Sequence, residues 1–138
     1  NRQYIAFQHG AQANLLVNGD GTVSAQRMRK HRRWPDSNVT VTSKTRLTPG
    51  RFHHAAVTYD GRELRLYLDG RLEAAAPCDG TRSNEGFFIG GVPERLHDFA
   101  GAGSGRFRGT LLRLSIAVRA LTESEVARMA GRARLTGL

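Results

Sequence analysis

The segment that most constrains the fold of this chain is residues 51–72, RFHHAAVTYDGRELRLYLDGRL. Two apolar runs, residues 52–59 and 64–68, are each followed by an Asp-Gly dipeptide. Asp-Gly readily supplies the positive φ angles that tight hairpin turns require. The segment is therefore predicted to form an antiparallel meander, with residues 71–76 as its third strand.

The second strand of this meander predicts a sheet with one buried face. Leu64, Leu66 and Leu68 fall on one side of the strand, whereas Arg65 and Tyr67 fall on the other. Successive side chains of a strand point to opposite faces of the sheet. The three leucines are therefore expected in the core, and Tyr67 is expected on the opposite face.

Similar runs and turns lie on both sides of the meander. The other predicted strands are residues 3–8, 14–17, 22–28, 38–45, 85–91 and 107–118. Asn18-Gly19-Asp20-Gly21 predicts a hairpin turn, and the glycine-rich residues 101–105 indicate a flexible loop. Many alternating strands with a single helical pattern predict an all-β antiparallel sandwich.

One short helix is predicted near residues 122–130. Thr122 can cap its first turn, and Glu125 is placed as the reciprocal half of a capping box. Gly131 is expected to end the helix. The chain, residues 1–138, is thus predicted to be one domain with a C-terminal helix.

The central segment resembles a known family. An aromatic residue, His53-His54, an apolar run into Thr-Tyr-Asp-Gly and then Leu-Arg-Leu-Tyr-Leu-Asp-Gly-Arg are similar to the signature of laminin-G-like, concanavalin-A-like lectin jelly rolls. The last predicted strand adds a second similarity where it runs into Arg119-Ala120-Leu121. The resemblance spans about residues 51–131. It implies a concanavalin-A-like jelly roll and a secreted or cell-surface location.

The composition is basic. Lys and Arg number 21 against 12 Asp and Glu, which gives a formal net charge of +9, and only Lys30 and Lys44 are lysines. An arginine-biased genome and an anionic partner both account for this charge. No apolar run approaches the roughly 18 residues of a membrane span. Cys78 is the single cysteine, so the chain has no internal disulfide.

Positive charge is densest in residues 27–33, which hold five cationic side chains in seven positions. Pro35 predicts that this run leaves the sheet as an exposed loop. Arginine pairs bidentately with sulfate, carboxylate or phosphate, and an indole packs against a sugar ring. The candidate ligand-binding residues are Arg29, His31, Arg32, Arg33 and Trp34. The alternative is a solvated loop anchored by its tryptophan.

Neither catalysis nor a metal site is predicted. Retaining glycosidases need two carboxyl groups about 5 Å apart, but the alternate pair Glu123 and Glu125 opens the predicted helix. His53 and His54 are adjacent on a strand, so they face opposite sides and are expected to be structural. Many laminin-G-like domains bind calcium through loop carboxylates, so calcium is implied by the resemblance alone. Asp20 has no carboxylate cluster around it, and no cofactor is predicted.

The leading functional interpretation is a non-catalytic carbohydrate-binding module for an acidic glycan, within a larger extracellular protein or enzyme. The alternative is a structural or interaction module that docks on an enzyme or surface protein without binding sugar. Nucleic acid is disfavoured because the aromatic residues lie on predicted strands rather than in an exposed stacking series. One cationic patch around residues 29–33 would favour an anionic ligand, whereas evenly spread arginines would not.

The resemblance also implies an incomplete sandwich. Jelly rolls of this family begin with about two strands ahead of the position of residue 1, and one of them pairs with the last strand. Residues 110–118 would then expose an apolar edge that recruits other strands. A partner polypeptide, a second subunit or a preceding segment is expected to cover it. In the alternative, residues 3–8 take the vacant place.

Overall fold

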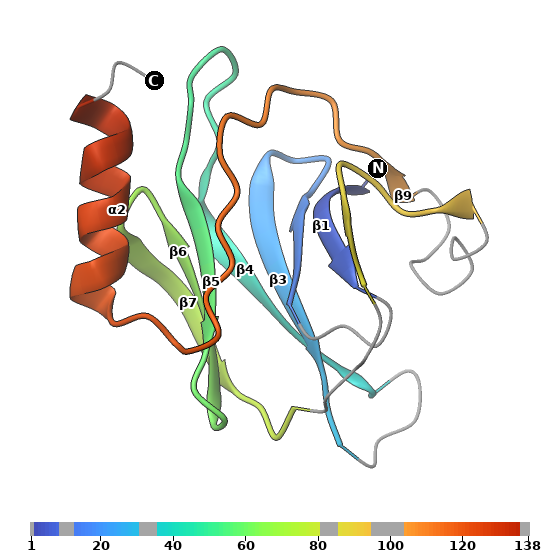
Figure 1. Cartoon of the computed structure of the whole chain (residues 1–138). Helices are drawn as coiled ribbons and strands as arrows, with labels where there is room; N and C mark the ends of the chain where they lie inside the picture. Colours follow the sequence, from blue (N-terminus) through green and yellow to red (C-terminus); the bar gives the residue numbers. More distant parts are fainter. Residues whose placement is uncertain (1, 9–12, 31–35, 81–85, 95–103, 136–138) are drawn as a thin grey trace.

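The computed structural model describes residues 2–8, 13–30, 36–80, 86–94 and 104–135. Two β-sheets lie face to face, and a C-terminal helix lies beside the smaller sheet (Figure 1). The strands are β1 (Arg2–Gln8), β2 (Asn14–Val17), β3 (Thr22–Met28), β4 (Asn38–Arg46), β5 (Ala55–Tyr59), β6 (Glu63–Leu68), β7 (Arg71–Pro77), β8 (Phe87–Ile89) and β9 (Ser104–Arg106), and the helix is α2 (Glu123–Leu135). This is the predicted antiparallel β-sandwich with a C-terminal helix.

The larger sheet has the strand order β4-β3-β2-β1-β8, and β9 pairs in parallel with β1. The smaller sheet is the predicted meander, in the order β5-β6-β7. Its second turn is left-handed at both central residues, with φ angles of 51° at Asp69 and 82° at Gly70. Asp-Gly therefore forms the hairpin as its chemistry predicts. The first strand begins at Ala55, later than expected.

The larger of two buried clusters lies between the two sheets. Leu64, Leu66 and Leu68 of β6 are buried, as the alternation predicts. They form one cluster with inward residues of the larger sheet, namely Val23, Ala25, Val39 and Val41. Glu73 of β7 joins the sheets at one side, because its carboxylate accepts hydrogen bonds from the backbone N–H groups of Lys44 and Thr45, at 2.8 and 2.9 Å.

Tyr67 is fully buried, contrary to its predicted place on an open face. It does alternate with the core leucines, so it lies on the outer face of the smaller sheet. Helix α2 packs close to this sheet: a Cβ on Gly70 would lie 3.2 Å from the Cα of Ala127. Val126 of α2 is also fully buried. We attribute the burial of Tyr67 to this helix. The alternation of residues within β6 carries no information about where the helix lies.

The predicted capping box opens α2. The Thr122 hydroxyl accepts from the Glu125 N–H at 3.2 Å, and the Glu125 carboxylate accepts from the Thr122 N–H at 2.7 Å. Arg119 also pairs with this carboxylate, and together these contacts lower the pKa of Glu125 to about 2. The expected stop at Gly131 is wrong, because the helix continues to Leu135. Glycine in a helix interior costs only about 1 kcal/mol.

Two predictions near the C-terminal end are also wrong. Within the expected flexible loop, Ser104–Arg106 form β9. The expected strand at residues 107–118 does not form, and this part of the chain runs as a coil from β9 towards α2 (Figure 1). Alternating apolar residues favour a strand, but a strand needs a neighbour to bond its backbone. The alternative in which residues 3–8 pair with a strand at residues 110–118 is wrong too, because β1 pairs with β2, β8 and β9.

Candidate ligand-binding site

The candidate site begins where β3 leaves the larger sheet. The Arg29 N–H donates to the Ser37 carbonyl at 2.7 Å, and Arg29 also forms an isolated β-bridge with Gly80. These contacts extend the β3–β4 ladder beyond Met28. Arg29 is half-buried and Lys30 is exposed. The backbone of Arg29 is therefore bonded to a neighbour on both sides.

Arg27 is withdrawn from the solvent, although it belongs to the cationic run in the sequence. Its side chain is 9% exposed, and its Cζ lies 3.6 Å from the centroid of the Tyr59 ring. A guanidinium stacked on an aromatic face gains a cation–π interaction. The Tyr59 hydroxyl in turn donates to the Cys78 carbonyl at 3.0 Å. Arg27 thus closes the end of the core and does not face a ligand.

The same contacts set the electrostatics at Cys78. Burial raises the pKa of the Cys78 thiol, and the nearby positive charges of Arg27 and Arg29 oppose that effect. The thiol is therefore a buried, neutral part of the core at pH 7. The remaining candidate residues, His31, Arg32, Arg33 and Trp34, lie outside the described residues. Arg29 is the one candidate whose position can be described.

A feature that the sequence analysis missed leads to this basic end. The outward face of β3 and β4 carries a row of hydroxyl and amide side chains, which we name the polar strip: Ser24, Gln26, Asn38, Thr40 and Thr42. The Ser24 and Thr42 hydroxyls lie 2.8 Å apart. The Gln26 amide donates to the Thr40 hydroxyl at 3.3 Å. The alternation of threonine with valine in residues 38–42 is the sequence signal that could have indicated this row of polar side chains.

The polar strip has a fixed geometry and two distinct ends. Register pairs Met28 with Asn38, so the strip ends one residue before Arg29, whose own side chain alternates onto the inner face with Arg27 and lies near Cys78. At its far end, Thr42 and Lys44 line an open hollow of about 470 Å³ with residues 72–75 of β7. Asn38, Thr40 and Thr42 are exposed, whereas Ser24 and Gln26 beside them on β3 are buried. Thr40 and Thr42 are therefore held from the neighbouring strand, and their exposed sides are open to a ligand.

The two histidines have structural contacts, as predicted. The Thr48 N–H donates to Nε2 of His53 at 3.0 Å, so Nδ1 carries the proton and donates to Asp69 at 2.8 Å. The other carboxylate oxygen of Asp69 accepts from the His54 N–H at 2.9 Å. Burial lowers the pKa of His54, and the charge of Asp69 partly opposes it. This network fixes the entry of the chain into β5.

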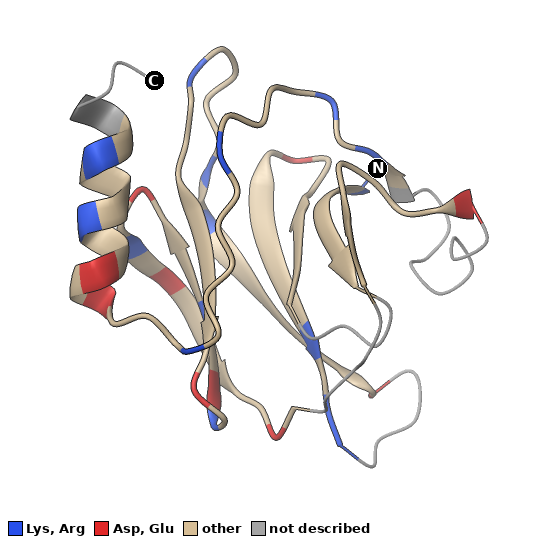
Figure 2. Ribbon diagram, in the orientation of Figure 1, with Lys and Arg blue, Asp and Glu red and all other residues tan. Residues whose placement is uncertain are grey.

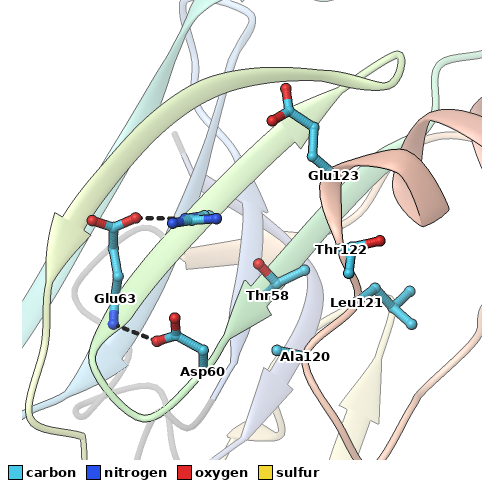
Figure 3. Close-up of a pocket in the computed structure, with 8 residues that line it drawn as sticks. Thr58, Asp60, Glu63, Ala120, Leu121, Thr122 and Glu123 are labelled. Carbon is cyan, nitrogen blue, oxygen red and sulfur yellow. Dashed lines mark hydrogen bonds and ion pairs between the residues drawn. The ribbon is translucent and has the colours of Figure 1, made fainter.

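A second hollow lies on the outer side of the smaller sheet (Figure 3). It has a volume of about 310 Å³, and residues 120–123 line it together with Thr58, Asp60, Glu63 and Arg65. Asp60 accepts hydrogen bonds from the Arg62 and Glu63 N–H groups, and Glu63 pairs with Arg65. These carboxylates are thus engaged in holding the turn. No group of three or more His, Cys, Asp or Glu side chains suited to a metal ion occurs within the described ranges.

Comparisons with known proteins agree with this architecture. The chain is similar to a crystal structure of an S-layer domain-containing protein (residues 221–444) from Clostridium thermocellum, with 22% identity and a TM-score of 0.54. The match covers 94% of this chain and 63% of that chain, and at this identity it concerns the fold alone. A search of curated proteins found no match.

Two further findings bear on identity. In the part of the chain that the structure describes, no helix is long and apolar enough to cross a membrane. The sequence matches the family described as the concanavalin A-like lectin/glucanases superfamily over residues 1–127. The chain therefore belongs to the concanavalin A-like lectin/glucanases superfamily.

Proposed function

We propose that this domain is a non-catalytic module that binds an anionic glycan as part of a larger surface protein. The observation that carries the proposal is the polar strip, which runs along the outward face of β3 and β4 to the point where the sequence becomes strongly basic. Membership of a superfamily that contains lectins supports it. The similarity to an S-layer domain-containing protein supports a surface location.

The chemistry of the polar strip suits a sugar chain. Exposed hydroxyl and amide groups at Asn38, Thr40 and Thr42 donate and accept hydrogen bonds, as sugar hydroxyls do. Thr40 and Thr42 are already oriented by Gln26 and Ser24, so less conformational entropy is lost when a ligand binds. A flat row on two paired strands matches an extended polymer better than a small compact ligand.

The cations supply the expected charge preference. The exposed Lys30 follows the end of the polar strip in the chain, and the sequence continues into Arg32 and Arg33. Arginine pairs with sulfate or carboxylate through two parallel hydrogen bonds. The module is therefore expected to prefer sulfated or uronic-acid polymers over neutral ones.

A glycan array with neutral, sulfated and uronic-acid polymers tests the proposal. Thr40→Ala with Thr42→Ala should weaken binding to every glycan that the domain takes. Arg29→Ala with Arg32→Ala and Arg33→Ala should weaken binding to acidic polymers only. Thermal stability of the threonine variant should change little, because Thr40 and Thr42 are exposed.

A matched control separates a site from general attraction. The variant Arg71→Ala, Arg128→Ala, Arg132→Ala removes the same charge from exposed positions on β7 and α2. It should retain heparin-column binding that the first triple variant loses. Equal losses in both variants, or no glycan bound at all, would contradict the proposal.

A second candidate is an interaction module that binds no sugar. Described lysines and arginines are not confined to the end of β3, since they lie on most strands and along α2 (Figure 2). This distribution favours a general basic composition over a single anion site. Equal losses in the two triple variants above would support this second candidate.

A further inference from the structure

The coil between β9 and α2 exposes unusually apolar side chains. We name residues 109–118 the open segment. Its backbone makes no backbone hydrogen bond with any other residue that the structure describes. Its large apolar side chains have exposed fractions between 43% and 108%: Leu111, Leu112, Leu114, Ile116 and Val118. Soluble proteins usually cover such a concentration of apolar surface.

The open segment has the sequence pattern of a half-buried strand. Leu112, Leu114, Ile116 and Val118 recur at every second position, with Arg113, Ser115 and Ala117 between them. In an extended conformation the first set would form one apolar face. The segment is therefore suited to a sheet in which it has not found a neighbour.

The smaller sheet has room for additional strands. It contains three strands, and β5 pairs with β6 on one side only within the described part of the chain. Ala120 and Leu121, just after the open segment, line the same hollow as Thr58 of β5 (Figure 3). The open segment thus ends beside the free edge of β5.

The larger sheet also carries exposed apolar side chains, on β8. Strand pairing shows which face they are on: Ile89 pairs with Ala6, and Ala6 pairs with Leu15, which packs in the core between the sheets. Paired residues share a face, so Ile89 and Phe87 of β8 point towards the space opposite their sheet. Their exposed fractions are 45% and 38%. Among the described residues, no strand of the smaller sheet covers this half of the sandwich over β8.

We propose that the open segment and the β5 edge accept an extended strand from a polypeptide outside residues 1–138. Strand addition would bond the free backbone groups, and apolar side chains at alternate positions would cover Phe87, Ile89 and the open segment. The proposal goes beyond glycan binding and does not depend on it. It concerns the opposite part of the fold from the polar strip.

Charge indicates what kind of strand fits. Residues 99–122 contain four arginines and no Asp or Glu, and three of them, Arg106, Arg108 and Arg113, lie outside the Arg119–Glu125 ion pair. Opposite charges on neighbouring strands stabilise a sheet, and like charges destabilise it. A second copy of this chain would bring the same arginines to the same edge. The accepted strand therefore alternates apolar residues with acidic ones.

A synthetic peptide, Ac-EVTVEVTVEV-NH2, tests this inference with the full chain. We expect saturable binding in fluorescence anisotropy, and new protection of the amides of residues 111–116 in hydrogen exchange. The same peptide with lysine in place of glutamate should bind about tenfold more weakly, because two or three charge pairs are each worth up to about 1 kcal/mol. A peptide with a central proline should not bind.

Variants locate the contact. Leu114→Asn with Ile116→Asn should weaken binding of the peptide about tenfold, since each change removes apolar burial at the contact. Ser115→Asn with Ala117→Asn changes the other face of the same segment and should leave binding unchanged. Circular dichroism confirms folding of both, which is expected because all four side chains are exposed.

Four results would overturn the inference. They are protection of residues 111–116 in the free chain, a stable dimer in light scattering, no peptide binding, and peptide binding that leaves these amides unprotected. Equal affinity for the lysine peptide would overturn its acidic character. Loss of glycan binding leaves all of these readouts unaffected, so the two proposals fail separately.

Discussion

A pair of leucine substitutions tests whether the two halves of this sandwich differ in their exposure. We call the structure a half-open sandwich, because the half around β6 is closed by both sheets, whereas the half at the open segment is exposed to solvent. Leu66 of β6 is 0% exposed in the closed half, and Leu114 of the open segment is 44% exposed. Both residues are leucines at alternating apolar positions, so sequence pattern alone treats them alike. We expect Leu66→Ala to be strongly destabilising and Leu114→Ala to be nearly neutral.

The expected magnitudes follow from burial. Leu→Ala removes three carbon atoms, each worth about 0.8 kcal/mol when buried, and a cavity term is added in a packed core. Leu66→Ala should therefore lower the free energy of unfolding by about 3 to 4 kcal/mol. At Leu114 much of the side chain is already in water and no closed cavity is left, so the loss should stay below about 1 kcal/mol.

Urea unfolding, followed by circular dichroism, measures both losses. With a slope of about 2 kcal/mol per M, Leu66→Ala should shift the midpoint by roughly 1.5 to 2 M and Leu114→Ala by less than about 0.5 M. Ile116→Ala, at 64% exposure, is a second test on the open segment. Similar shifts for Leu66→Ala and Leu114→Ala would refute the half-open sandwich.

The remaining predictions concern turns and the helix. Gly80→Ala should lower stability by about 1 to 3 kcal/mol in a thermal melt, because its Cβ would collide with the buried guanidinium of Arg27; Gly86→Ala, with open space around it, should be nearly neutral. Gly131→Ala should raise stability by about 0.5 to 1 kcal/mol, because this residue lies inside α2, and a loss would show that the helix ends there. The arginine beside Glu125 holds its pKa near 2, below the ordinary 4.5, so its stabilisation is present above pH 4.5 and is lost as the pH falls through 2. Glu125→Gln should remove that part of the acid sensitivity in pH-dependent melts.

Much of the fold follows from local chemistry that is visible in the sequence. Asp69-Gly70 adopts the left-handed pair of φ angles that a two-residue hairpin needs, and the leucines of β6 are buried as their alternation predicts. The capping box at Thr122 forms as its spacing predicts. In each case the deciding interaction lies within a few residues.

The misses have a non-local cause. Tyr67 is buried, and we attribute this to a helix some 60 residues later in the chain, which packs close to the same sheet at Gly70. Residues 107–118 have the pattern of a strand, but no described neighbour forms a backbone hydrogen bond with residues 109–118. The alternation of apolar residues predicts that a segment is able to form a strand. Whether the strand forms depends on a neighbouring strand that can bond with its backbone.

The ligand-binding role of the candidate residues stays a prediction. Arg29 lies at the end of β3, and the other four candidate residues are outside the described ranges. Arg27, which looks equivalent to Arg29 in the sequence, is stacked on Tyr59 and closes the core. The polar strip was missed because its members come from two strands, and only their register brings Ser24 beside Thr42 and Gln26 beside Thr40.

Hydrogen exchange followed by NMR on the isolated chain tests the central claim most directly. Amides of β6, which are bonded on both sides, should exchange slowly, at rates set by global unfolding. Amides of residues 111–116 should exchange at close to the rates of an unstructured peptide. Protection of residues 111–116 equal to that of β6 would show a complete sheet and contradict the half-open sandwich.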